Sequence, residues 1–137
     1  MEFLETSELV IDTNIIIDYL RRSFHALPLI LAQYQCRLTV ITLYEIQIAK
    51  INSSRQQQLF ERVMGLTSIL SLDVPAAVQA IQIERKLKAQ GQLIGLPDIF
   101  IAGICLAQRI PLLTRNLNHF SRIEGLQVIT PENLSGL

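Results

Sequence analysis

The chain has 137 residues, of which 50% are hydrophobic and 18% are charged, so its composition excludes an intrinsically disordered protein and fits one domain with its own core. Its 12 basic residues balance its 12 acidic residues, so the net charge gives no sign of a nucleic-acid-binding surface. Cys36 and Cys105 lie far apart without metal-ligand spacing, and we expect two reduced, buried thiols.

Short aliphatic runs with strand character alternate along the chain with longer stretches of helical periodicity. In chain order, we predict a strand at 8–11, helices at 14–22 and 25–35, a strand at 38–41, helices at 42–51 and 54–66, a strand at 69–72, helices at 75–91 and 97–107, and strands at 111–114 and 127–130. The helix at 97–107 is apolar nearly all round, which predicts a position deep in the fold. This alternation is typical of a single α/β domain, residues 1–137, with a mostly parallel sheet.

The chain carries no pattern typical of export or membrane insertion. Its opening residues, MEFLETSE, are acidic where a signal peptide is basic. Its longest apolar runs, ALPLILA and IFIAGICLA, fall well below the ~20 residues that cross a bilayer. We therefore expect a cytoplasmic protein without membrane contact.

Four polar residues stand in apolar surroundings beside the predicted elements. Asp12 directly follows the first predicted strand, Glu45 lies in the first turn of the helix after the second, and Asn116 follows the fourth. Asp98 is the second residue of the helix that Pro97 opens. In an open α/β sheet, ligands bind beyond the carboxyl ends of the strands, so these residues are candidates for one shared site.

Each of these residues also has a purely structural interpretation. Asp12 could cap the helix that follows it, and Thr42 and Glu45 have the spacing of a capping box. Asp98 at a helix start is favoured by the helix dipole, and Asn116 is an ordinary turn residue. Capping does not explain why several strand ends at one edge carry such residues. Clustered carboxylates repel one another unless a cation intervenes, and Mg²⁺ prefers oxygen ligands, so we interpret Asp12 as a metal ligand at the end of a buried strand.

Four motifs, VIDTNIIID, TLYEIQIAK, GLPDIFIAG and LLTRNLNHF, together resemble the successive motifs of the PIN-domain family, in particular its VapC-type toxin ribonucleases. The resemblance runs from about residue 8 to about residue 132. It implies a PIN-like (Rossmann-like) three-layer α/β/α sandwich with a mostly parallel five-stranded sheet. It also implies an endoribonuclease that depends on Mg²⁺ or Mn²⁺, acts as the toxin of a type II toxin–antitoxin system, forms homodimers and is inhibited by a small VapB-type antitoxin whose C-terminal segment occupies the active-site groove.

The same resemblance assigns roles to individual residues. Asp12, Glu45 and Asp98 match the family's acids and would hold the metal ion. Thr114 matches a hydroxyl residue that orients the first acid, and Asn14 matches an asparagine that braces the loop after the first strand. Water activated by the metal would then hydrolyse an RNA phosphodiester bond.

The fourth catalytic position departs from the fullest family pattern. Asn116 stands where many members carry aspartate, and His119 stands where some carry a second acid. The loss of one charge favours a single tightly held ion over two. Asn116 is also the basis of the alternative function, a catalytically inactive PIN-like module that only binds RNA or protein. We expect His25 and His119 to be surface or turn residues, because the mechanism needs no histidine.

Contacts with the RNA backbone require local cations in a chain of zero net charge. Arg115 is the strongest candidate, because it adjoins Asn116, and Arg85 and Lys86 supply a second cluster on one predicted helix. A solvated helix face is the alternative for that cluster. Arg21 and Arg22 would instead pair with Asp18 or contact the partner protein. A dinucleotide-binding domain is excluded because the turn after the first strand, DTNIII, contains no glycine.

The apolar excess predicts a surface for a second copy or for the antitoxin, since exposed apolar patches mark interaction sites. The candidate residues are Phe24, Leu27, Leu29 and Ile30, followed by Leu59, Phe60 and Val63. The alternative is that these side chains fill the core. An antitoxin would also place a basic side chain among the acids, in competition with the metal.

Overall fold

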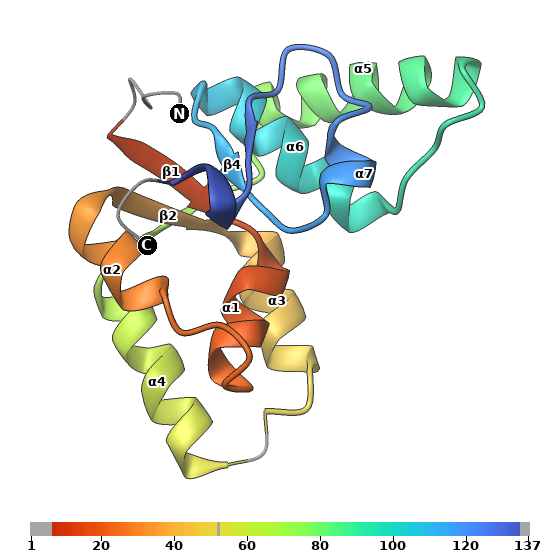
Figure 1. Ribbon diagram of the computed structural model, residues 1–137. Helices are drawn as coiled ribbons and strands as arrows, with labels where there is room; N and C mark the ends of the chain where they lie inside the picture. Colours follow the sequence, from red (N-terminus) through yellow and green to blue (C-terminus); the bar gives the residue numbers. More distant parts are fainter. Residues whose placement is uncertain (1–6, 52, 135–137) are drawn as a thin grey trace.

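The structure, a computed structural model, describes residues 7–51 and 53–134, so most of the acidic N-terminal stretch lies outside the described residues. Five strands and seven helices alternate along this part of the chain (Figure 1). In chain order they are β1 (Glu8–Ile11), α1 (Thr13–Leu20), α2 (Leu27–Gln33), β2 (Gln35–Thr39), α3 (Val40–Ile48), α4 (Ser54–Gly65), β3 (Ser68–Leu70), α5 (Val74–Ala89), α6 (Leu96–Gln108), β4 (Leu112–Leu113), α7 (Leu117–Phe120) and β5 (Val128–Ile129), followed by a 3₁₀ turn, Pro131–Asn133.

The strands form one sheet in the order β3-β2-β1-β4-β5, and all four neighbouring pairs are parallel. β1 is the central strand, and Val10 pairs with Arg37 of β2 on one side and with Leu112 of β4 on the other. The parallel order places the carboxyl ends of all five strands at the same edge. The predicted five-stranded α/β fold is confirmed.

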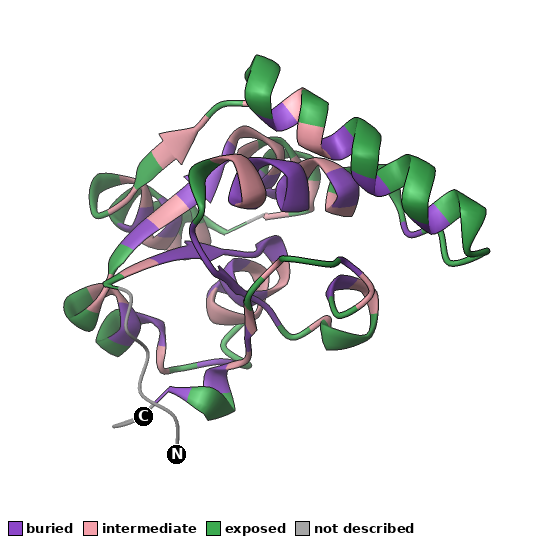
Figure 2. Cartoon of the chain, turned by 90° about the horizontal axis from the view of Figure 1, so that it is seen from above, coloured by how far each residue is buried: buried purple, intermediate pink, exposed green. Residues whose placement is uncertain are grey.

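Helices cover both faces of this sheet, which makes three layers (Figure 1). Successive side chains of a strand point to opposite faces, and β1 shows this directly. Leu9 and Ile11 pack in a core with α1, α2 and α4, whereas Val10 packs in a second core with α5 and α6. All three β1 residues are buried because the central strand has a helical layer on each side, as the inner strands in Figure 2 show.

Local signals placed most helix starts correctly. α5 and α6 each carry proline in their first turn, where the missing N–H has no partner to lose. Gly91, after α5, has a φ of +66°, a left-handed conformation that favours glycine. α6 is buried as predicted, and Gly103 lets α5 come close, because a Cβ there would lie 2.7 Å from the carbonyl oxygen of Ala76.

The boundary between β2 and α3 was predicted wrongly. β2 begins at Gln35, because Gln35 pairs with Glu8 of β1, and it ends at Thr39, before the predicted end at 41. The Thr39 hydroxyl caps α3 by accepting from the backbone N–H of Thr42 at 3.1 Å. The proposed capping box of Thr42 and Glu45 is therefore wrong, and Glu45 lies in the second turn of α3.

Most of the apolar residues expected at an interaction surface lie in the core instead. Five of them are buried: Phe24, Leu27, Ile30, Phe60 and Val63. Leu29 is half-exposed, at 49%. Leu59 is partly buried against the same core. The five buried side chains fill the core under α2 and α4, so they do not support a docking surface.

Two further expectations concern the two cysteines and the absence of membrane-spanning segments. Cys36 and Cys105 are both buried and free, and burial raises the pKa of both thiols, which makes them poor nucleophiles. Within residues 7–51 and 53–134, we find no helix that combines the length and hydrophobicity needed to span a bilayer.

Candidate functional site

Asp12 stands at the carboxyl end of the central strand, where β1 passes into α1. It is the N-cap of α1, and its Oδ1 accepts a hydrogen bond from the backbone N–H of Thr13 at 2.8 Å. Its Oδ2 accepts from the hydroxyl of Thr114 at 2.6 Å, immediately beyond β4. Only 3% of the residue is exposed. The helix-capping role and the role in the group of acids are therefore not alternatives for Asp12, because the same carboxylate can serve in both.

The environment of Asp12 disfavours its ionised form. Burial raises its pKa from the ordinary 3.8 to about 6, although the hydrogen bonds from Thr114 and Thr13 act in the opposite direction. The negative charges of Asp98 and Glu45 raise the pKa further. Both carboxylates therefore lie close enough to act on Asp12, and a cation among them would relieve the repulsion.

Glu45 reaches the site from α3 and is held by a chain of threonine hydroxyls. The Thr13 hydroxyl donates to Glu45 Oε1 at 2.7 Å, and the hydroxyls of Thr13 and Thr42 lie 2.9 Å apart. The Thr39 hydroxyl donates to that of Thr42 at 3.4 Å. Because the Thr13 proton goes to the carboxylate, Thr13 accepts from Thr42, and every hydroxyl in the chain points its hydrogen toward Glu45. All three threonines are buried.

Asp98 reaches the site from the first turn of α6. Its Oδ2 lies 3.0 Å from Nδ1 of His119, on α7. The same Nδ1 lies 2.9 Å from the side-chain amide nitrogen of Asn116, the residue before α7. Asn116 in turn donates its backbone N–H to the Thr114 hydroxyl at 2.9 Å. The loop after β4 thus contacts Asp12 through Thr114, and α7, which follows the loop, contacts Asp98 through His119.

The structure brings together the acids Asp12, Glu45 and Asp98 with Thr114 and Asn116, as the sequence predicted. It also adds two residues that sequence reasoning had not assigned. Thr13 bonds two acids at once, and its only signal was its place beside Asp12. His119 is a partly exposed residue of the short helix α7, as expected, and in addition it contacts Asp98. Its signal was the three-residue spacing from Asn116, one turn of a helix.

The predicted basic residues separate into two groups. Arg115 lies beside the site: its Nε bonds Asp18 Oδ2 at 3.1 Å, and its guanidinium lies 4.7 Å from the centre of the Phe24 ring. Asp18 therefore pairs with Arg115, whereas Arg21 and Arg22 are exposed. The backbone N–H of Arg115 also donates to Asn14 Oδ1 at 3.4 Å, so Asn14 links the start of α1, just after β1, to the loop after β4.

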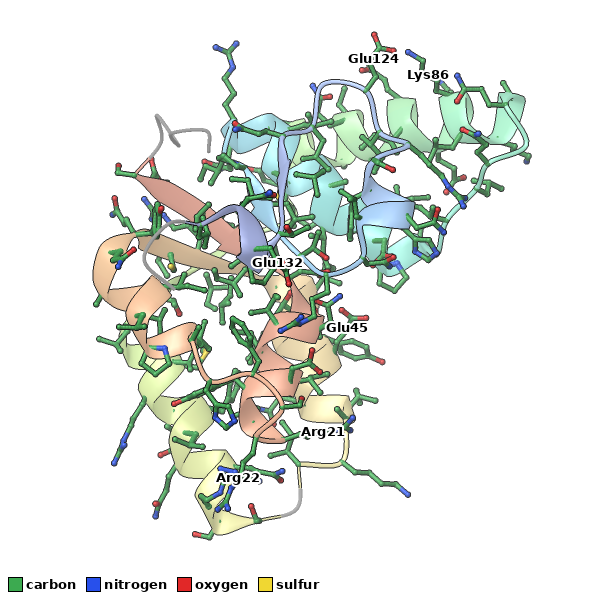
Figure 3. All side chains as sticks on the ribbon, in the orientation of Figure 1. Arg21, Arg22, Glu45, Lys86, Glu124 and Glu132 are labelled. Atoms are coloured by element: carbon green, nitrogen blue, oxygen red, sulfur yellow. The ribbon has the colours of Figure 1, made fainter. Side chains whose placement is uncertain are left out.

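The second basic group lies elsewhere. Arg85 and Lys86 are exposed on α5, and Lys86 forms an ion pair with Glu124. Figure 3 shows Lys86 and Glu124 near the top of the molecule and Glu45 near its middle. Lys86, paired with Glu124, is therefore not brought to the acids.

The acids suit a hard divalent cation in their chemistry, since all their donor atoms are carboxylate oxygens. In the described part of the chain, no three His, Cys, Asp or Glu side chains are close enough together to hold an ion by themselves. Mg²⁺ is usually held by one or two carboxylates and completes its octahedron with water. The donor set thus fits an ion held directly by one or two of these acids.

Known proteins and a family model match this chain over most of its length. The family model of the PIN domain matches residues 9–126. Ribonuclease VapC1 of Rickettsia felis is 30% identical over 129 residues, which cover 89% of this chain and 95% of that protein. Ribonuclease VapC1 of Methanocaldococcus jannaschii is 29% identical over 126 residues, 90% of this chain and 88% of that one. The crystal structure of DNA-bound VapBC from Salmonella typhimurium aligns with a TM-score of 0.78 at 25% identity, over 90% of this chain and 97% of that chain.

Proposed function

The chain belongs to the PIN-domain family, and from that premise we propose that it is a metal-dependent endoribonuclease, the toxin of a type II toxin–antitoxin system. The names of its relatives, Ribonuclease VapC1, and its similarity to a VapBC structure support this proposal. The observation that carries it is the convergence of Asp12, Glu45 and Asp98, in which a buried carboxylate has a raised pKa and two negative neighbours.

In the proposed reaction, Asp12 and Asp98 would hold Mg²⁺ or Mn²⁺, directly or through water. Such an ion supplies a bound water of lowered pKa and a positive charge opposite the phosphoryl oxygens. The chain's own residues supply the orientation. Thr13 and Thr114 each hold one oxygen of Asp12, so its carboxylate cannot rotate without losing a hydrogen bond. Glu45 has Oε1 fixed by Thr13 and can accept a proton from the attacking water on Oε2.

Arg115 is the residue we propose for the RNA backbone at the site. Its Nε is bonded to Asp18, and its guanidinium is stacked over Phe24, so the side chain is ordered before RNA binds. Within residues 7–51 and 53–134, its terminal nitrogens form no hydrogen bond or ion pair, and they are suited to bind phosphate. Arg85 and Lys86 remain RNA contacts only for a substrate that extends to α5.

We also propose a small VapB-type antitoxin as partner, one chain per toxin chain, and a homodimer of the toxin. An antitoxin that places a basic side chain among the three acids would compete with the metal for the same negative charge. Inhibition should then weaken as the Mg²⁺ concentration rises. For the dimer, one candidate surface is on α5, where the exposed residues Val74, Val78 and Ile81 are spaced four and three apart along one helix face.

Two experiments test the proposed activity, and a third tests the homodimer. Induced expression of the chain alone should arrest growth, and expression of the Asp98→Asn variant at the same level should not. Purified chain should cleave RNA with Mg²⁺ or Mn²⁺ and stop in EDTA. A chain that binds RNA but cleaves none with either ion would favour the inactive PIN-like module. Light scattering that shows only a monomer at tens of micromolar would refute the homodimer.

A further inference from the structure

The fourth position of the site raises a question of charge, because Asn116 and His119 stand where carboxylates could extend the metal site. Neither is deeply buried, yet both are engaged in contacts with the rest of the site. The contacts form a continuous path from one acid to the other. It runs from Asp12 through Thr114, Asn116 and His119 to Asp98, with successive heavy-atom separations of 2.6, 2.9, 2.9 and 3.0 Å.

The hydrogen on the His119 ring can be assigned from these contacts. Nδ1 carries either one hydrogen or one lone pair in the ring plane, so it cannot both donate to a carboxylate and accept from an amide. At 3.0 Å from Asp98 Oδ2, a bare Nδ1 would face the lone pairs of a carboxylate oxygen. A hydrogen on Nδ1 turns this contact into a charge-assisted hydrogen bond. Asn116 then offers its amide oxygen to the same N–H, since the two ends of an amide have nearly the same shape.

We infer that His119 is a positioning residue for Asp98: its Nδ1–H donates to Oδ2, holds the carboxylate in one rotamer and leaves Oδ1 for the metal ion. This inference rests on the proposed metal-dependent function. Asn116 supports the imidazole and links it to Thr114, so Asn116 is not itself a metal ligand. The fourth position therefore contributes hydrogen bonds that orient the acids and adds no negative charge.

The geometry also explains why a histidine serves here. α7 has only four residues and begins directly after Asn116, so the ring at position 119 is brought back over the loop by a single helical turn. A carboxylate at this position would lie beside Asp98 and repel it. An imidazole that donates from Nδ1 gives Asp98 a hydrogen bond without adding a like charge. Groups that hydrogen-bond a metal ligand typically change metal affinity 10- to 100-fold when they are removed.

The first test needs no substitution and no metal. In EDTA at mildly alkaline pH, two-bond ¹H–¹⁵N spectra report which ring nitrogen of a neutral histidine carries hydrogen. The chain has two histidines, so the exposed His25 is an internal reference. We expect His119 to carry its hydrogen on Nδ1 and to lose that preference in the Asp98→Ala variant. A His119 ring with its hydrogen on Nε2 in the unmodified chain would overturn the inference.

The second test measures Mn²⁺ binding by calorimetry without RNA. His119→Phe keeps a ring but removes the N–H, and we expect binding about 10- to 100-fold weaker. His119→Asn places an amide nitrogen at the same point along the side chain and should bind within about 3-fold of the unmodified chain, a recovery that a merely space-filling role does not predict. His25→Phe is the matched control and should bind unchanged. Thermal unfolding confirms that each variant is folded.

The outcomes separate this inference from the proposed function. If the unmodified chain binds Mn²⁺ and folded His119→Phe binds it equally well, only the positioning role is overturned. The same holds if His119→Asn is folded but binds as weakly as His119→Phe. If the unmodified chain shows the Nδ1–H form and binds no Mn²⁺, the proposed metal-dependent function fails, and the positioning role toward a metal fails with it.

Discussion

The acids of the site are held in two different ways. In the threonine-held half, Asp12 and Glu45 are fixed by buried hydroxyls of Thr13, Thr42 and Thr114. In the histidine-held half, Asp98 is fixed by His119, whose side chain is 38% exposed. The first half is built into the ends of central elements, whereas the second depends on a four-residue helix at the surface.

This difference separates two physical problems that a metal site must solve. The threonine-held half has rigid geometry, but burial makes the charge of Asp12 costly, as its raised pKa shows. In the histidine-held half, the carboxylate of Asp98 is partly exposed to solvent, and fewer contacts fix its position. A cation bound between the two halves would offset the negative charge of Asp12 and would order the side chain of Asp98.

The largest expected effect tests whether the two halves form one site. Asp12→Asn and Asp98→Asn should each lower RNA cleavage by about 1,000-fold or more, because each removes a charge that holds a cation worth several kcal/mol in the transition state. Cleavage is measured at saturating Mg²⁺ with variants shown to be folded. If one variant cleaves like the unmodified chain, the two halves do not share an ion.

The second prediction concerns pH and the burial of Asp12. In metal-free protein its pKa is about 6, against 3.8 ordinarily, so between these values the folded chain binds a proton more tightly than the unfolded chain. Stability from this group is therefore complete below about pH 4 and is lost as pH rises through 6. The shift corresponds to about 2–3 kcal/mol. The measurement is urea unfolding in EDTA. Between pH 4 and pH 7, the free energy of unfolding of Asp12→Asn should rise by that amount relative to that of the unmodified chain.

The control for this prediction uses the metal ion. Added Mg²⁺ should reduce the advantage of Asp12→Asn, since an ion that binds the folded state stabilises it. An Asp12→Asn difference that is constant across this pH range would contradict the raised pKa.

The ends of the strands and helices could be predicted from the sequence to very different degrees. The end of β1 and the starts of α5 and α6 follow local signals: an aliphatic run closed by Asp12, and prolines at Pro75 and Pro97. The start of α3 does not, because Thr39 and Thr42 are both suitable caps. The pairing of β2 with β1 from Gln35 onward decides between them, and that is a long-range contact.

The candidate site shows the same division between local and long-range information. Asp12, Glu45 and Asp98 could be identified because each acid stands out in an apolar stretch, and the family pattern supplied Thr114. His119 and the hydroxyl of Thr13 could not, because their roles depend on side chains 21 and 32 residues away. A helix of four residues also shows too little periodicity to be predicted.

The third prediction tests the hydroxyl chain of the threonine-held half. Thr13→Val removes the donor to Glu45 and should weaken Mn²⁺ binding and cleavage about 10-fold or more. Thr13→Ser keeps the hydroxyl and should lose about 3-fold at most. Glu45→Gln loses the charge but can still accept from Thr13, so it should impair cleavage without loss of stability. If Thr13→Val, shown to be folded, cleaves as well as Thr13→Ser, the chain does not position Glu45.

The smallest effects are expected from the cationic side chains, and they compare the site with the exposed surface of α5. Arg115→Gln removes one phosphate contact beside Asn116, and we expect RNA affinity to fall about 5-fold, since a single exposed charge contributes on the order of 1 kcal/mol. Lys86→Gln is the matched change on α5, where Lys86 is paired with Glu124, and it should leave affinity for a short RNA unchanged. Both are measured as binding to a non-cleaved RNA at two salt concentrations, because phosphate contacts weaken with salt and the Arg115 variant should show the smaller slope. Equal losses from both variants would mean that bound RNA extends over α5. A loss from Lys86→Gln alone would place the RNA-binding surface on α5, away from the three acids.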